Sequence, residues 1–392
     1  MTEIIHAGGN SLAKKTAQSV SVPKVMPIYM SSVFSFDDVP SLEGVYDGAQ
    51  SGYVYTRMAN PSIDCVQEVL TAAEGGGGTL VFSSGMAAIV TAIIANVKAG
   101  DHLLASPVLY GGVYDYLKNE LARFGVQVDF VDFINDDLEK YFQPHTKIVY
   151  TETITNPLME VMDIKKIADI AHRHGAKMII DNTFATPALC RPMDFGADIA
   201  VYSATKYLGG HSDITAGVVA ASAGEIAEMQ RHATLYGNRL SPFDCWLLTR
   251  SMRTLALRMR AHSQNAQKLA EYLEGHPKIE RVYFAGLASS PFHALAASQF
   301  QNGWCGGMLS ADIAGGEQGA CAFIAACENI KFVPSLAGVS TSLSYPAKTS
   351  HRAYSPEELL KCGISPGQIR FSVGLENIED VIQEFDQALA KI

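Results

Sequence analysis

Between residues 62 and 240, short apolar runs alternate with helical patterns, and this alternation restricts the fold more than any other feature of the chain. Largely apolar runs are typical of strands that are buried on both faces of a sheet. Strands that alternate with helices form βαβ units, whose strands are parallel. We therefore predict an α/β fold with a mostly parallel seven-stranded sheet, whose strands lie near 79–82, 102–105, 126–131, 147–151, 177–180, 199–202 and 217–221.

The chain divides into three predicted parts. Residues 1–58 hold few periodic segments and are predicted to form an arm that contacts an adjacent subunit. Residues 59–257 are predicted to form the large sheet domain, and residues 258–392 a smaller α+β domain. Ser241 is a good helix N-cap, and the pattern after it predicts one long helix to Glu274 that bridges the two domains.

Composition excludes several classes of function. The chain has 392 residues and a formal net charge of −10, whereas a nucleic-acid-binding protein needs a basic face. No apolar stretch is long enough to span a membrane. The seven cysteines are scattered, and no Cys/His cluster has the spacing of a metal site. We expect a cytoplasmic protein with reduced thiols and no metal.

One lysine stands in an unusual place. Lys206 follows the apolar run 199–202, among small and hydroxyl-bearing residues. Desolvation at the end of a buried strand should lower the pKa of its amine and make the amine nucleophilic, as a covalent bond to an aldehyde cofactor requires. Ser203 and Thr205 add hydroxyls that can hold a phosphate. The segment therefore suits pyridoxal phosphate (PLP), and a surface lysine in a polar loop is the alternative.

A second apolar run ends in an acid. Asp181 follows the run 177–180 and lies 25 residues before Lys206, the spacing of one strand–turn–strand excursion. A carboxylate beside the pyridine nitrogen of PLP keeps that nitrogen protonated, which makes the ring an electron sink. The alternative is an aspartate that starts a turn after a strand.

Three further segments follow predicted strands. Gly85 and Met86 begin a helix whose free N–H groups can bind a phosphate, although a tight turn also explains them. Tyr110 can stack on a flat ring and act as an acid or base, or it can be an ordinary half-buried tyrosine. Asn156 can direct its amide at the cofactor 3′-oxygen, or it can form a turn with Pro157.

Two arginines are candidates for binding anions. Arg370 lies in a strand-like pattern, where its guanidinium can hold a substrate α-carboxylate with two hydrogen bonds or form a structural ion pair. Tyr55 and Arg57 are the best polar pair of the arm. They can reach a neighbouring subunit's phosphate if the arm packs there, and otherwise they are merely solvated.

Taken together, the motifs resemble those of the Cys/Met-metabolism PLP-dependent enzymes, which include methionine γ-lyase, cystathionine γ-lyase, cystathionine γ-synthase and O-acetylhomoserine sulfhydrylase. The resemblance covers nearly the whole chain. It implies the aspartate-aminotransferase-like fold (fold type I), PLP as cofactor, a small sulfur amino acid as substrate and a homotetramer of catalytic dimers. The matching motifs are His6-Ala7-Gly8-Gly9, YTRMANPS, FSSGMAA, LYGG, ETITNP, IIDNTFATP, SATKYLGGH and IRFSVGLE.

The resemblance also implies a role for each motif residue. Lys206 is the lysine that bonds to the cofactor, Asp181 the partner of the pyridine nitrogen and Tyr110 the residue stacked on the ring. The substrate carboxylate is bound by Arg370, with Ser335 and Asn156 nearby. The remaining cofactor residues are Gly85, Met86, Asn156, Thr183, Ser203 and Thr205, with Tyr55 and Arg57 donated by the adjacent subunit.

Relatives that cleave cystathionine carry three charged residues that bind the far end of that long substrate. Val54, Asp115 and Ser340 occupy those positions here. A site without these groups suits a short, neutral tail. Gly112 stands where methionine γ-lyases carry a cysteine. Homocysteine therefore remains an alternative substrate to methionine.

The resemblance therefore implies α,γ-elimination of methionine or homocysteine to 2-oxobutanoate, ammonia and a thiol or sulfide. Cystathionine γ-lyase or γ-synthase activity and O-acetylhomoserine sulfhydrylase activity are alternatives, because γ-replacement shares the first half of the route. A non-catalytic binding protein of the same fold is a remote alternative, since both Lys206 and Arg370 are present.

Overall fold

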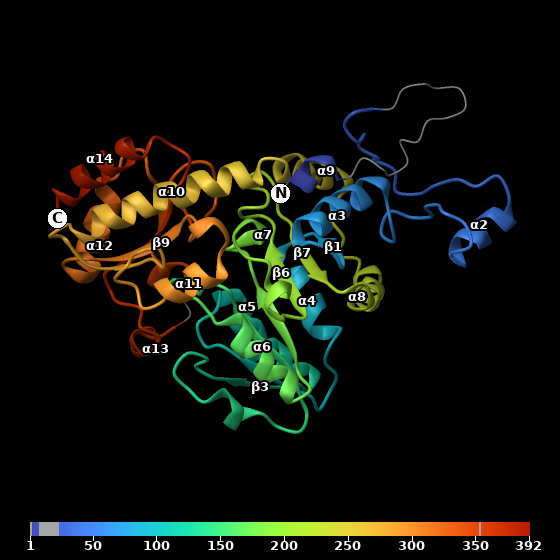
Figure 1. Ribbon diagram of the computed structural model, residues 1–392, viewed down its shortest axis with the longest axis horizontal. Coiled ribbons are helices and arrows are strands. Elements are labelled where there is room, and N and C mark those ends of the chain that lie inside the picture. The colour runs from blue at the N-terminus through green and yellow to red at the C-terminus, as the bar shows by residue number, and fades with distance from the viewer. Residues whose placement is uncertain (1, 8–22, 353) are drawn as a thin grey trace.

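The computed structural model describes residues 2–7, 23–352 and 354–392. Gly8 and Gly9 of the N-terminal motif, and a large part of the predicted arm, lie outside these residues. Within them, the chain builds two sheets that lie at opposite ends of one long helix (Figure 1).

The large sheet has seven strands in the order β1-β7-β6-β5-β4-β2-β3. The five strands from β6 to β3 are parallel to their neighbours, whereas β7 is antiparallel to both β6 and β1. The prediction of a mostly parallel seven-stranded sheet is confirmed. Its strands are β1 (Gly78–Phe82), β2 (His102–Ala105), β3 (Gln127–Phe130), β4 (Thr146–Glu152), β5 (Lys177–Asp181), β6 (Ile199–Ser203) and β7 (Gly217–Ala221).

Helices cover this sheet, and several of them begin at a side-chain cap. Asn60 accepts a hydrogen bond from the backbone N–H of Ser62 at the start of α3, and Gly75 ends that helix in the left-handed conformation with φ 84°. Ser84 caps α4 in the same way. The helices up to residue 236 are α1 (Thr2–His6), α2 (Val39–Tyr46), α3 (Pro61–Glu74), α4 (Gly85–Ile94), α5 (Gly111–Asp115), α6 (Ile164–Arg173), α7 (Thr186–Leu189) and α8 (Ala223–Tyr236).

Helix α1 of the arm packs against α3, whereas the later stretch of the arm projects away from the body of the molecule, with α2 at its far end (Figure 1). No residue of α2 is buried. Apolar side chains along this stretch are exposed, among them Met30, Val33 and Val39. Such a surface suits a protein–protein contact.

The prediction of one helix from Ser241 to Glu274 is wrong in one respect. Two helices occupy the segment, α9 (Pro242–Met252) and α10 (Leu255–Glu274), with a break at Thr254. The Ser251 carbonyl, which would continue the helix, accepts instead from Arg258 Nη2 at 2.9 Å and from the Thr254 hydroxyl at 3.2 Å. The Ser251 carbonyl also accepts the Thr254 backbone N–H at 3.2 Å. The same arginine binds the Tyr207 carbonyl, so a tertiary contact accompanies the local turn at the break.

The second sheet has five strands in the order β10-β11-β12-β9-β8 and lies against α10, α12 and α14. Helix α10 also contacts α7 of the large domain, as a bridging helix should. The division at 58 and 257 stays a prediction. The remaining elements are β8 (Ile279–Tyr283), α11 (His293–Gln299), β9 (Met308–Ile313), α12 (Gly316–Ala326), β10 (Lys331–Phe332), β11 (Ser342–Ser344), α13 (Pro356–Lys361), β12 (Gln368–Ser372) and α14 (Ile378–Leu389).

A buried acid under the large sheet predicts how stability depends on pH. Glu74, the last residue of α3, accepts a hydrogen bond from the Tyr202 hydroxyl, and burial raises the pKa of Glu74 to about 7. The folded protein therefore binds this proton more tightly than the unfolded chain, so stability falls as pH rises from the unfolded pKa towards 7. Glu74→Gln should remove this loss and raise the free energy of unfolding relative to wild type by up to about 3 kcal/mol between pH 5 and pH 8.

The measurement is the urea-unfolding midpoint of both proteins at pH 5 and pH 8. Glu228→Gln, at an exposed position of α8, is the matched control and should leave the difference between the two pH values unchanged. An equal effect of both substitutions would show that the buried carboxyl is not the titrating group.

Candidate active site

A cavity of about 400 Å³ lies at the carboxyl ends of the parallel strands, where the large sheet meets the C-terminal domain. Ligands of open α/β sheets bind at this end of the strands. Eleven of the thirteen predicted site residues line this cavity, namely Gly85, Met86, Tyr110, Asn156, Asp181, Thr183, Ser203, Thr205, Lys206, Ser335 and Arg370.

Lys206 follows β6 and points its amine into the cavity, where Nζ donates a hydrogen bond of 2.9 Å to Ser335 Oγ. Burial, together with the positive charge of Arg370, lowers the pKa of Lys206 to about 8. No carboxylate forms an ion pair with this amine among the residues that the structure describes. The environment is the one expected for a nucleophilic lysine.

Asp181 is the last residue of β5 and is 8% exposed. Burial raises the pKa of Asp181 to about 6, although hydrogen bonds from Thr183 oppose the rise. One of these bonds joins the Thr183 backbone N–H to Asp181 Oδ1 at 2.9 Å. The carboxyl group is thus ionised near neutral pH in a site with little water, where a cationic partner stabilises it.

One end of the cavity, where α4 begins, is suited to bind an anion. The first N–H groups of a helix have no partners within the helix, and Gly85 and Met86 are the first residues of α4. A Cβ atom at Gly85 would lie 2.8 Å from the Ser203 Cβ, so only glycine lets the two segments approach this closely. The Thr205 hydroxyl lies beside them and donates to the Ala216 carbonyl.

A second end of the cavity holds Arg370, which is 5% exposed on β12. Its Nη1 donates a hydrogen bond of 2.8 Å to Asn156 Oδ1, and its Nη2 lies 3.5 Å from the Ser335 carbonyl oxygen. No described carboxylate forms an ion pair with it. A buried guanidinium held only by neutral groups is a ready site for a carboxylate.

The sequence interpretation missed Glu152, which ends β4 and lines the same cavity. Its Oε1 accepts a hydrogen bond of 2.6 Å from the backbone N–H of Tyr110. The reasoning used for Asp181, an acid directly after an apolar run, would have found it.

A Cβ at Gly112 would lie 2.7 Å from the Tyr110 ring, so the ring lies where a side chain at 112 would lie.

Tyr55 and Arg57 are the two predicted site residues that do not line the cavity. Arg57 donates a hydrogen bond of 2.7 Å to the Thr234 carbonyl, and its guanidinium carbon lies 5.7 Å from the centre of the Tyr55 ring. Both side chains are exposed in the single chain. Their service to a neighbouring subunit stays a prediction.

None of the three residues at the positions of the cystathionine-binding charges lines the cavity. Asp115 is exposed and accepts a hydrogen bond from Asn119. Ser340 is exposed, and Val54 lies on the arm, where its carbonyl accepts from the Phe34 N–H. Among the residues that the structure describes, the charged ones that line the cavity are Glu152, Asp181, Lys206 and Arg370.

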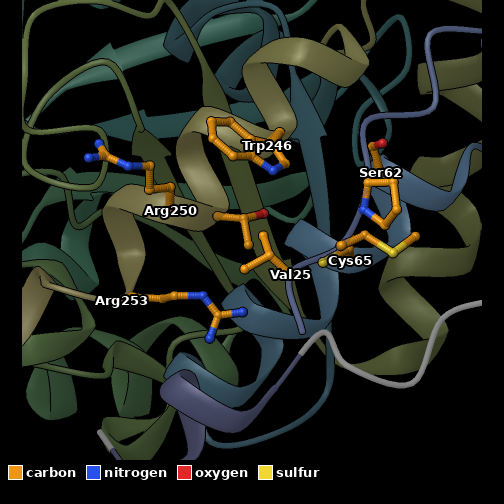
Figure 2. Close-up of a pocket in the computed structure, with 9 residues that line it drawn as sticks. Val25, Ser62, Cys65, Trp246, Arg250 and Arg253 are labelled. Carbon is orange, nitrogen blue, oxygen red and sulfur yellow. The ribbon is translucent and has the colours of Figure 1, made fainter. Parts of the chain in front are cut away.

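A second, smaller cavity of about 210 Å³ lies between the arm, α3 and α9 (Figure 2). Val25, Ser62 and Cys65 line one part of it, and Trp246 faces them from α9. Arg250 and Arg253 reach it, but its described lining has no carboxylate and no lysine. It therefore lacks the acid–base groups that the first cavity has.

Two further structural findings concern metals and membranes. Across the described ranges, no three His, Cys, Asp or Glu side chains are grouped so that they can hold a metal ion. No helix in the same part of the chain has the length and apolar character needed to cross a bilayer.

Residues 1–390 match the family described as Cys/Met metabolism PLP-dependent enzyme. The chain belongs to this family. It is 42% identical over 367 residues to L-methionine gamma-lyase of Porphyromonas gingivalis, covering 93% of this chain and 92% of the relative. It is 40% identical over 395 residues to cystathionine gamma-lyase of Bacillus subtilis, covering 100% and 99%. A solved cystathionine gamma-lyase from Lactobacillus plantarum, complexed with L-serine, superposes with a TM-score of 0.90 at 33% identity, covering 100% and 98%.

Membership of the Cys/Met-metabolism family confirms the predicted fold class and the predicted cofactor, PLP. The protein is a PLP-dependent carbon–sulfur lyase of sulfur amino-acid metabolism. The residues of the cavity fit the cofactor: N–H and hydroxyl groups suit its phosphate, Asp181 suits its ring nitrogen, and the Lys206 amine suits its aldehyde.

Proposed function

We propose that this enzyme catalyses α,γ-elimination of methionine or homocysteine, releasing 2-oxobutanoate, ammonia and a thiol or sulfide. The observation that carries the proposal is the set of charges in the cavity. Lys206, Asp181 and Arg370 have roles with the cofactor and the α-carboxylate, and Glu152 lies beside Asp181. No charged lining residue of the described chain remains for the far end of cystathionine. A neutral tail therefore fits best.

Each residue has a role in this proposal. PLP supplies the electron sink when it is bound. Arg370 binds the substrate carboxylate, and Asn156 orients Arg370 through its Oδ1. The amide NH₂ group of Asn156 would hold the cofactor 3′-oxygen. Lys206 would take the α-proton, pass it to the carbon framework of the bound cofactor and, neutral again, take a proton from Cβ. Tyr110 covers the ring and donates a proton to the leaving thiol.

The proposed assembly is a homotetramer of catalytic dimers. In each dimer the arm of one subunit brings Tyr55 and Arg57 to the phosphate of the other. Two features support this arrangement: the pair is exposed in the single chain, and the arm carries exposed apolar side chains. We also propose a cytoplasmic location, on the grounds of the reduced cysteines.

A substrate panel tests the proposal. Formation of 2-oxobutanoate is measured with methionine, homocysteine, cystathionine and O-acetylhomoserine, with and without sulfide. We expect kcat/KM for methionine or homocysteine to exceed that for cystathionine by at least about tenfold, because the charged end of cystathionine would lose its water without gaining a partner. Faster turnover of cystathionine would favour a cystathionine γ-lyase. Homocysteine that forms from O-acetylhomoserine with sulfide, while 2-oxobutanoate forms from none of the four substrates, would favour the replacement reaction.

A further inference from the structure

Two carboxyl groups lie side by side at the floor of the active-site cavity. Glu152 and Asp181 are register partners at the ends of the parallel strands β4 and β5. Register partners in a sheet present their side chains on the same face. The two residues are 6% and 8% exposed, and both line the cavity. Two buried carboxylates at paired positions of neighbouring strands repel one another, so one of them keeps a proton.

The environments of the two groups differ. Asp181 accepts hydrogen bonds from Thr183, which favour its ionised form. Burial, and then the charge of Asp181, raise the pKa of Glu152 well above its ordinary value. The Tyr110 N–H, the positive charge of Arg370 and the Asn156 N–H only partly oppose this rise. Glu152 is therefore the member that holds the proton, and Asp181 is the ionised member.

The other groups around Glu152 do not reverse this order. Those that act on it or feel its charge are Asp181, Arg370, Tyr150 and Tyr354. Burial raises the pKa of both tyrosines, so they stay neutral. Burial lowers the pKa of Arg370 to about 10, so it stays cationic, yet it forms no ion pair with Glu152 among the described contacts. Burial, and then the positive charge of Arg370, lower the pKa of both Lys206 and His351.

We propose that Glu152 is a positioning residue that stays protonated in the working enzyme, holding the Tyr110 backbone while leaving the charge of Arg370 free for the substrate carboxylate. An ionised Glu152 would compete with the substrate for Arg370. It would also disfavour the ionised state of Asp181 on the neighbouring strand. The inference rests on the proposed function in taking Arg370 as the carboxylate site.

Glu152→Gln tests the protonation state, because glutamine is a neutral acid's closest match and keeps an acceptor for the Tyr110 N–H. The measurement is the infrared C=O band of protonated carboxylic acids in the holoenzyme at pH 8.5, above the pKa of Glu74. Wild type should show a band that Glu152→Gln lacks and that Glu74→Gln retains. A wild-type spectrum without this band would overturn the proposal.

Glycine binding tests whether Glu152 leaves the charge of Arg370 free, because glycine carries only the amine and carboxylate that all amino acids share. Its Kd is read at pH 7.5 from the change in the visible cofactor band. We expect Glu152→Gln to change this Kd by less than about fivefold, since the native side chain is already neutral, whereas removal of a negative charge beside Arg370 would change it by more. A larger change overturns the inference alone. A holoenzyme with no cofactor band would instead overturn the proposed function.

Discussion

Lys206→Ala should abolish both turnover and the visible absorption band of bound PLP. The amine lies in the cavity at the end of β6, and burial together with Arg370 lowers its pKa to about 8, so it can react at moderate pH. It is also the base for two proton transfers in the proposed reaction. We expect kcat to fall by at least about 10⁴-fold, the upper range for one positioned acid–base group, because the covalent step is lost as well.

The matched control is Lys268→Ala on α10, where the lysine side chain is 58% exposed and lies 3.5 Å from Glu379. This variant should keep the band and the activity. A Lys206→Ala enzyme that retains the band, or that turns over within about tenfold of wild type, would show that another amine serves the cofactor.

Arg370→Ala should raise KM for the amino-acid substrate by about 100-fold or more. The guanidinium is buried, is held by Asn156 and Ser335 through neutral oxygens, and has no described carboxylate partner of its own. Truncating one member of a buried charge pair costs about 2–5 kcal/mol. The KM of Arg370→Lys should lie between those of wild type and Arg370→Ala, because lysine keeps the charge but loses the two parallel hydrogen bonds.

The control for this prediction is a ligand rather than a variant. The amine formed by decarboxylation of methionine keeps the sulfur tail but lacks the carboxylate. Its binding, read from the cofactor band, should be nearly equal in wild type and Arg370→Ala. An equal loss for the amine and the amino acid would mean that Arg370 holds the C-terminal domain in place rather than the substrate.

Much of the large domain was predictable because its signals are local. The run 177–180 and β5 agree almost residue for residue, as do the run 199–202 and β6. A strand buried on both faces needs apolar side chains on both, so the signal is continuous. The break before α10 was not predicted, because Arg258, which binds the Ser251 carbonyl there, also binds the Tyr207 carbonyl 51 residues away, a contact that no local pattern reports.

The candidate site likewise has a part that local sequence signals predict and a part that they do not. The sequence by itself predicted Lys206 and Asp181, since Asp181 ends one buried strand, Lys206 closely follows another, and the spacing between them is one excursion of the chain. Only the tertiary structure decided that Glu152 lies beside Asp181. The family resemblance implied that Asn156 lies near Arg370, and the structure adds the hydrogen bond that joins them across 214 residues. The physical reason is that apolar patterning reports how one segment is buried, whereas strand register and domain packing decide which distant polar groups share that buried space.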